Sequence, residues 1–446
     1  MKLSAENPWW NKGGLWQDPD LSRVKASPLQ YHPRPFSPSV CKQSAVLTLR
    51  GPRRVGKTVA LKLLIAELIE KHAWDPQTIT WTALDTFRTL VQLEEHLLNI
   101  AVERKPRLLV VDEATTVTGW QRVVKKLRDD GTLADCCIIL TGSSAYDLKA
   151  GAERMAGRRG DVPDPDRVLL PMSFHDFASH VHGGKGAVQD YLRVGGFPFR
   201  VEQFLLKRDW NEFDGFQVFD DVLFYELTRR RLDRSIAIEV LGRLSAIGCS
   251  SASYEAFIKP LSMAKDTARK YLDALGDAFL LATISSYDTS RGRVAPKKDR
   301  KFVWIDPALG YTGKWLRQAE APSDASRAEW AVGATLLRHH EPRLWEGLSA
   351  PRGVFTWKSS GGNEIDYLVV DKSRKLLFPV EVKYQNSISD WDFQVIERAF
   401  GRGWLVSPEI DRARQKSEAL SLEHFFSQVG TIGAAPNPSP GGISKG

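Results

Sequence analysis

Cysteine is scarce in this chain of 446 residues. There are four cysteines, and two of them, Cys136 and Cys137, are adjacent within an apolar run. This usage favours reduced core residues over a disulfide framework or a zinc site. Long apolar runs are also missing, because none approaches the roughly eighteen residues of a membrane-spanning helix. The first ten residues lack the basic-then-apolar layout of a signal peptide, so we expect a cytoplasmic protein with no membrane partner.

The chain carries a modest excess of positive charge, +8 at neutral pH with a pI near 9.2. Such an excess favours an anionic partner such as nucleic acid, although proteins without that role also carry it. The length is sufficient for two or three domains with sizeable cores.

Residues 51–58 have the sequence G-P-R-R-V-G-K-T, between an apolar run and a segment whose apolar residues have helical spacing. This pattern predicts a P-loop that binds ATP. Its glycines let the backbone turn so that N–H groups face the phosphates, and the helix N-terminus adds positive potential. Lys57 would reach the β- and γ-phosphates, and Thr58 would ligate Mg²⁺. The predicted binding residues are Gly51, Pro52, Arg53, Arg54, Val55, Gly56, Lys57 and Thr58.

Asp112 and Glu113 follow a predicted strand at 107–111 that ends in four apolar residues. Such strands are typical of parallel sheets buried on both faces. An Asp at the end of the strand would face Mg²⁺, and the next Glu would reach the attacking water. We therefore predict Asp112 as an Mg²⁺ ligand and Glu113 as the catalytic base. The alternative is an acidic pair that caps the next helix.

A further predicted strand, 136–140, ends in T-G-S-S. A polar side chain here would lie between the γ-phosphate and the water, so Thr141 and Ser143 are candidate catalytic residues. A plain turn is the alternative.

Arginines occur in the stretch 151–160, just before a predicted strand at 168–170. An arginine at this point can touch the γ-phosphate bound by a neighbouring subunit and stabilise charge in the transition state. Arg158 is the first choice, with Arg159 and Arg154 as alternates, and a solvated basic loop is the other interpretation.

Several motifs together carry a resemblance to a known family. They are L-R-G-P-R-R-V-G-K-T, V-V-D-E followed by Gly119-Trp120, L-T-G-S-S, Y-L-R-V-G-G-F-P at 191–198, and the stretches 253–287 and 361–383. The chain resembles the AAA+ P-loop ATPases that carry a C-terminal DUF4143 region, and the resemblance spans all but the two ends. It implies an α/β fold with a parallel-sheet ATPase core, in which Thr141 and Ser143 fall at the sensor 1 position. The stretch 154–167 departs from the family pattern.

Helical patterns from 186 to 245 predict a lid, and two short helices at 253–261 and 262–275 follow. A strand and a basic tip come next, with Arg291, Arg293, Lys297, Lys298, Arg300 and Lys301. This order is that of a winged helix, which places one helix in the major groove of DNA and a wing on phosphates. A winged helix used for protein packing is the alternative.

The C-terminal stretch suggests a second chemistry. Alternation along a strand places Glu381 and Lys383 on one face, and Asp366 is expected on the adjacent strand, so Asp366 and Glu381 could ligate a second Mg²⁺. Glu329, in a predicted helix, is a further candidate ligand. The set resembles the core of PD-(D/E)xK, restriction-endonuclease-like nucleases. Domains of this kind can also serve only to hold DNA.

The predicted organisation is an irregular arm at 1–44 that packs its tryptophans on the ATPase core at 45–185, a helical lid and winged helix at 186–301, a nuclease-like domain at 302–430 and a disordered tail at 431–446. The leading hypothesis is an ATPase, assembled as a ring and favoured as a hexamer, that translocates on or remodels duplex or branched DNA. An ATP-gated regulator of a protein partner or operator and an ATP-licensed nuclease are the alternatives.

Overall fold

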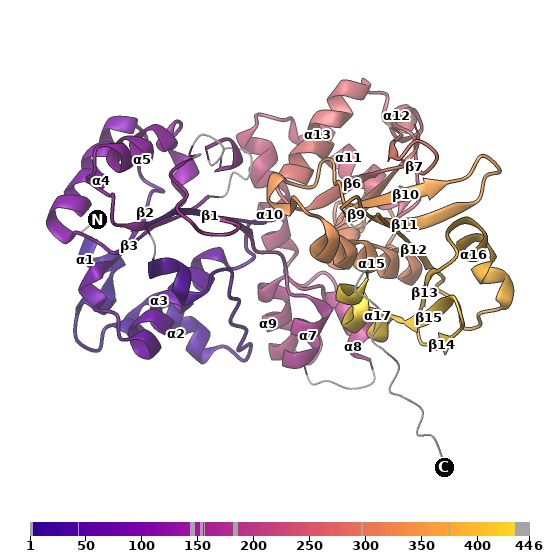
Figure 1. The fold of residues 1–446 in the computed structure, drawn as a ribbon, viewed down its shortest axis with the longest axis horizontal. Helices are drawn as coiled ribbons and strands as arrows, with labels where there is room; N and C mark the ends of the chain where they lie inside the picture. The colour runs from indigo at the N-terminus through magenta and orange to yellow at the C-terminus, as the bar shows by residue number, and fades with distance from the viewer. Residues whose placement is uncertain are drawn as a thin grey trace, which may run out of the picture.

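The computed structural model describes residues 3–42, 44–142, 148–151, 155, 157–181, 186–295, 298–373 and 375–432. Two lobes lie side by side in Figure 1, with helix α10 (Phe216–Arg229) between them. The N-terminal lobe, on the left, is built on a parallel sheet. The other lobe contains a helical region and a second, mixed sheet.

The first sheet has five parallel strands in the order β2-β3-β4-β1-β5. Its central strands are apolar runs buried on both faces, as in sheets covered by helices on each side. Because the strands are parallel, their carboxyl ends share one edge, where ligands bind in open α/β sheets. The strands are β1 (Val46–Arg50), β2 (Ile79–Ala83), β3 (Leu108–Asp112), β4 (Cys137–Thr141) and β5 (Asp166–Val168), and the covering helices are α3 (Lys57–His72), α4 (Leu90–Arg104) and α5 (Trp120–Asp129).

The N-terminal arm is more ordered than the sequence indicates. It contains α1 (Leu3–Glu6) and α2 (Pro19–Ala26), besides several 3-10 turns. The expectation of a largely irregular arm was wrong, because Asp18 caps α2 by accepting hydrogen bonds from two backbone amides and Pro19 fits the first helical position. The tryptophans do pack on the ATPase core, since Trp9 and Trp10 both donate to the carbonyl of Ile79, at 3.1 and 2.9 Å.

The helical region ends in the element order expected for a winged helix. Strand β6 (Leu281–Ser285) pairs antiparallel with β9 (Arg300–Trp304), and the short pair β7 (Tyr287–Asp288) and β8 (Arg293–Val294) lies between them in the chain. The preceding helices are α7 (Phe174–His180), α8 (Ala187–Val194), α9 (Pro198–Leu206), α10, α11 (Arg234–Ile247), α12 (Tyr254–Ile258) and α13 (Lys265–Asp277).

The C-terminal sheet has six strands in the order β10-β11-β12-β13-β15-β14, with β12, β13 and β15 parallel to one another. The long helix α15 (Asp324–His340) packs against it. The strands are β10 (Val354–Lys358), β11 (Glu364–Asp371), β12 (Leu376–Val382), β13 (Gly403–Ser407), β14 (Arg412–Ala413) and β15 (Ser417–Ser421), and the remaining helices are α14 (Thr312–Trp315), α16 (Gln394–Phe400) and α17 (Leu422–Gln428).

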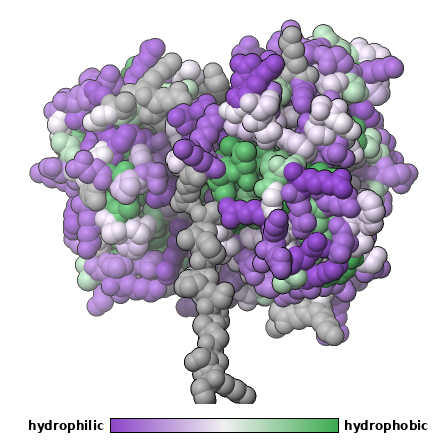
Figure 2. Space-filling model, turned by 45° about the vertical axis from the view of Figure 1, so that its right-hand side comes forward, coloured by the Kyte–Doolittle hydropathy of each residue, from purple (hydrophilic) through white to green (hydrophobic). Residues whose placement is uncertain are grey.

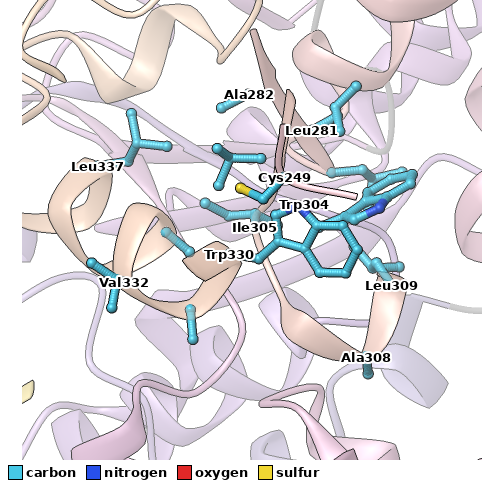
Figure 3. Close-up of a cluster of buried hydrophobic side chains, with 14 of the residues drawn as sticks. Cys249, Leu281, Ala282, Trp304, Ile305, Ala308, Leu309, Trp330, Val332 and Leu337 are labelled. Carbon is cyan, nitrogen blue, oxygen red and sulfur yellow. The ribbon is translucent and has the colours of Figure 1, made fainter. Parts of the chain in front are cut away.

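A single hydrophobic cluster joins the helical region to the C-terminal sheet. Figure 3 shows part of it, with Trp304 of β9 and Trp330 of α15 beside Cys249. The indole of Trp330 is fully buried and donates to the carbonyl of Phe302 at 3.2 Å. The boundary predicted between residues 301 and 302 therefore falls inside β9, in the middle of a shared core.

The surface is mostly hydrophilic on the face that Figure 2 shows, with a hydrophobic area near the middle of that face. Among the described residues, no helix combines the length and apolar character that crossing a membrane requires.

Candidate functional site

The loop 51–58 connects the carboxyl end of β1 to the first turn of α3. Gly51 has a φ of 141°, and a Cβ at this position would lie 2.0 Å from the carbonyl oxygen of Leu169, so no larger residue fits. Gly56 has a φ of 96° just before α3 begins. Both glycines are therefore required by the backbone path that brings the loop amides and the N-terminus of a sixteen-residue helix together.

The Lys57 side chain is buried against the loop. Its Nζ donates to the carbonyl oxygens of Gly51 and Pro52, at 3.0 and 2.8 Å. Burial lowers the pKa of this ammonium, and the nearby Glu113 and Asp112 carboxyl groups oppose the shift. An anion whose oxygens accept hydrogen bonds, such as a phosphate, could bind both the ammonium and the loop amides.

Asp112 ends β3 beside the loop. Its Oδ2 accepts a hydrogen bond from Thr58 Oγ1 at 2.9 Å, and its Oδ1 accepts one from the Thr141 hydroxyl. The Glu113 amide donates to Thr141 Oγ1 at 3.3 Å. Burial raises the pKa of Asp112 despite these hydrogen bonds. The sequence-predicted residues Thr58, Asp112, Glu113 and Thr141 thus meet at one sheet edge, whereas Ser143 lies outside the described residues.

A cleft of about 440 Å³ lies over the loop. Lys57, Thr58, Asp112 and Glu113 line one side of it, and the arm lines the other through residues such as Tyr31. The volume is within the range of small-molecule sites, roughly 300–1,000 Å³. Sequence reasoning missed the arm as a wall of this cleft, because no local pattern in the arm indicates where it packs.

Two polar contacts hold the arm over the cleft. The buried Lys62 of α3 pairs with Asp18 and Asp20 of the arm, at 2.8 and 2.7 Å. On the other side, the hydroxyl of Ser27 donates to the carboxylate of Glu202 on α9. The cleft is therefore bounded by elements from three parts of the chain.

Helix α10 contacts the P-loop directly. Asp221 accepts from Nε of Arg53 at 2.9 Å and from Nε of Arg54 at 3.1 Å, and the Arg53 guanidinium lies 4.1 Å from the centre of the Tyr225 ring. At the end of the helix, Arg229 donates to the carbonyl of Thr115, two residues after Glu113. One helix thus contacts both motif-bearing loops, which no sequence signal indicated.

Arg158 lies away from the cleft of its own chain. It forms an ion pair with Asp129 at the end of α5, with Nη2 2.8 Å from Oδ2. Gly160 approaches Ser44, just before β1, so this segment is at the sheet edge opposite the P-loop. Arg159 pairs with Asp166, and Arg154 is outside the described residues. Arg158 is not among the residues that line the cleft.

The predicted C-terminal residues do come together. Asp366 on β11 and Glu381 on β12 are neighbours, with the Asp366 amide donating to Glu381 Oε2 at 3.1 Å, and Lys383 Nζ lies 3.0 Å from Glu381 Oε1. Glu329 faces them from α15. Among the residues that the structure describes, however, no group of three or more His, Cys, Asp or Glu side chains is arranged to hold a metal ion.

The cluster contains a residue that the sequence analysis assigned elsewhere. Lys301 was predicted in the basic tip of the wing, and this is wrong, because it lies within β9 and its Nζ pairs with Glu329 and Asp366. Burial raises the pKa of Glu329. At Asp366 burial acts in the same direction, but the charge and hydrogen bond of Lys301, with the hydrogen bonds from the Val382 amide and Glu329, together leave the pKa below its usual range.

The other basic residues of the tip differ in exposure. Arg291, Arg293 and Lys298 are exposed, whereas Arg300 is half-buried with its guanidinium 4.4 Å from the centre of the Tyr254 ring. On α13, Arg269 and Lys270 are exposed. Lys297 lies outside the described residues.

Comparison with protein families gives one match at the nucleotide-binding lobe. Residues 43–178 match the family described as the AAA domain. This segment is similar to an AAA domain. The match includes every element of the AAA domain's parallel sheet, from β1 to β5, and both motif-bearing loops. Comparison of the sequence with curated proteins gives no match.

Solved structures of similar proteins include a Walker-type ATPase of Pyrococcus abyssi, with 14% identity over 68% of this chain and 95% of that one and a TM-score of 0.42. The ORC1 protein of Aeropyrum pernix in complex with DNA has 11% identity over 61% and 86%, with a TM-score of 0.32. The RuvB protein of Thermotoga maritima has 17% identity over 57% and 85%, with a TM-score of 0.29. TM-scores this low support no inference about the activity of this chain.

Proposed function

We propose that the protein hydrolyses ATP and uses the energy to translocate on or remodel duplex or branched DNA. The observation that carries the ATPase part is the meeting of Lys57, Thr58, Asp112, Glu113 and Thr141 at one edge of the AAA domain's sheet.

Each residue has a distinct role in this proposal. The loop amides and Lys57 bind the phosphates of ATP, and Glu113 accepts a proton from the attacking water. The hydroxyl of Thr58 and the carboxylate of Asp112, 2.9 Å apart, are hard oxygen donors of the kind that Mg²⁺ prefers. An Mg²⁺ ion held by Thr58 and Asp112 would neutralise part of the negative charge on the phosphates. Thr141 positions Asp112 and the backbone of Glu113 through its hydroxyl.

The DNA part of the proposal is supported by charge and by the order of elements. Helix α13 and the β7–β8 hairpin stand in the order of a winged helix and both present exposed arginine or lysine side chains. Phosphate contacts of this kind supply most of the affinity of sequence-independent DNA binding. The net charge of +8 acts in the same direction.

A ring, with six subunits favoured, is proposed from the position of Arg158. Its place at the sheet edge opposite the P-loop suits a residue that acts on the nucleotide of a neighbour. The ion pair between Arg158 and Asp129 would have to break before Arg158 could contact the nucleotide of the neighbouring subunit.

The second candidate function is an ATP-gated regulator of a protein partner or operator. The contacts of α10 with Arg53, Arg54 and Thr115 favour it, because a helix that contacts both nucleotide loops can report the nucleotide state without fast turnover. The rate of hydrolysis and its response to DNA separate the two functions.

The ATPase proposal is tested by measuring ATP binding and turnover in two variants. Lys57→Ala should weaken binding, because the phosphates lose their ammonium. Glu113→Gln should bind ATP and lose turnover by roughly two to four orders of magnitude, as removal of a general base does. The exposed pair Lys105→Ala and Glu95→Gln are matched controls and should behave like the parent. Parental turnover in Glu113→Gln would contradict the assignment.

A further inference from the structure

Lys301 is a buried cation at the centre of an acidic cluster. Only 4% of its side chain is exposed, its Nζ is 2.7 Å from Asp366 Oδ1, and it also bonds the carboxylate of Glu329. The ammonium lies 4.9 Å from the centre of the Tyr367 ring, which gives it a further favourable contact. It thus bridges two carboxylates that, in the sequence-based hypothesis, would share a divalent metal.

The other carboxylate oxygens of the cluster are directed at protein donors. Asp366 Oδ2 accepts from the Val382 amide at 2.8 Å, and the two oxygens of Glu381 accept from the Asp366 amide and interact with Lys383. A divalent ion would need several of these oxygens at once, at distances near 2.1 Å for Mg²⁺. An ammonium and such an ion cannot share the space between Glu329 and Asp366.

Lys301 reaches the cluster from another part of the fold. It belongs to β9, which pairs with β6 in the candidate winged helix, whereas Asp366 and Glu381 belong to the C-terminal sheet. Breaking a buried ion pair on one side leaves an uncompensated charge and is strongly destabilising. The cluster therefore fixes the winged-helix strand to the C-terminal sheet.

We propose that Lys301 is a built-in cation that takes the place of a catalytic metal, so that the C-terminal region is joined to β9 through this cluster and does not cut DNA. The inference goes beyond the ATPase proposal and does not depend on it. It removes the ATP-licensed nuclease from the candidate functions.

The first arm of the test is metal binding by the intact chain without nucleotide. We would titrate Mn²⁺ into the parent and into Glu381→Gln by calorimetry, and incubate both with linear and branched DNA. The proposal predicts equal Mn²⁺ uptake in the two proteins and no cleavage. A Mn²⁺ ion bound by the parent and lost in Glu381→Gln, or cleavage that needs Mn²⁺ and Glu381, would overturn it.

The second arm replaces the cation. Lys301→Met leaves Glu329 and Asp366 facing each other, so its Tm should fall by several degrees, and Mn²⁺ should restore part of this loss by binding one ion per chain. The triple variant Lys301→Met, Glu329→Gln, Asp366→Asn should recover stability without metal and gain nothing from Mn²⁺. If Lys301→Met folds and its Tm does not respond to Mn²⁺, the proposal that Lys301 takes the place of a metal ion would be contradicted. If Lys301→Met does not fold, the parent and Glu381→Gln decide the question.

Discussion

Asp306 is a fully buried carboxyl group where the helical region meets the C-terminal part. Its oxygens accept from the amides of Gly196 and Ala308, at 2.6 and 2.9 Å. Burial raises its pKa to about 6, although these hydrogen bonds and the guanidinium groups of Arg200 and Arg338 oppose the shift. An unfolded Asp ionises near pH 3.9, at about its usual pKa.

The sign of the resulting pH dependence follows from proton binding. Between about pH 4 and pH 6 the folded chain retains a proton on Asp306 that the unfolded chain has lost, so the free energy of unfolding should fall as pH rises, by about 3 kcal/mol over the window. Urea unfolding from pH 4 to pH 7 measures it. Asp306→Asn should remove this contribution to the pH dependence of the free energy of unfolding, whatever the overall stability of the variant. Parallel profiles for parent and variant would exclude Asp306 as the source.

Among single residues, those that lie within a contiguous sequence motif could be assigned from the sequence. Lys57, Thr58 and Asp112 could be assigned because the P-loop and the strand before Asp112 each have a local pattern with one chemical interpretation. Lys301 was misplaced, because its partners Glu329 and Asp366 are 28 and 65 residues away along the chain. A lysine next to other basic residues looks like part of an exposed tip until the fold places carboxylates around it.

At the scale of elements, α10 couples the P-loop to the helical region through Asp221. The Arg53 and Arg54 side chains are 31% and 56% exposed, so their ion pairs with Asp221 contribute little stability. Asp221→Asn should leave Tm nearly unchanged and free both guanidinium groups for phosphates. We expect ATP affinity to rise roughly two- to fivefold, the range that corresponds to an exposed pair.

The neighbouring residue offers a matched control for this measurement. Asp220, also on α10, pairs with Arg234 rather than with the P-loop, so Asp220→Asn should leave the affinity for ATP unchanged. Equal affinities for the parent and Asp221→Asn would mean that α10 does not restrain the loop.

Arg158 tests whether neighbouring subunits complete each other's sites. Arg158→Ala should bind ATP normally and lose turnover by about an order of magnitude or more, because a charge stabiliser is missing from the adjacent site. Mixing Arg158→Ala with Glu113→Gln protein should restore part of the activity, since some interfaces then combine two intact halves. Full activity of Arg158→Ala, or of a strictly monomeric parent, would argue against the ring.

Helices and strands could be predicted in segments whose apolar residues follow a single regular spacing. The strands β1, β3 and β4 and helix α3 follow from apolar runs and helical spacing around the motifs. The arm helix α2 was missed because the cap at Asp18 and the ion pairs of Lys62 with Asp18 and Asp20 that hold it leave no apolar periodicity in the sequence. Strand β5 begins at Asp166, two residues before the predicted start, because its pairing with β1 begins there.

At the scale of the whole molecule, the sequence predicted the kinds of element better than the divisions between them. A boundary was expected after residue 301, yet β9 continues through it and Trp304 packs with Trp330 in one core. Sequence segments with different patterns suggested separate domains, but apolar side chains from both segments bury one another. The elements from α12 to β9 and the C-terminal sheet should therefore unfold together.

The central claim is that ATP turnover at the AAA domain is linked to DNA, and one steady-state assay tests it most directly. ATP turnover would be measured with and without duplex DNA for the parent, for Glu113→Gln and for the triple variant Arg269→Glu, Lys270→Glu, Arg293→Glu. The substitutions Lys12→Glu, Lys105→Glu, Lys125→Glu, combined in one protein at exposed positions of the N-terminal lobe, are the control with the same change of charge. The account predicts several-fold stimulation by DNA in the parent and the control, and little in the triple variant, with stimulation that declines as salt rises. Glu113→Gln should turn over roughly two to four orders of magnitude more slowly than the parent with or without DNA. Turnover that DNA does not change, or equal stimulation of the triple variant, would contradict it.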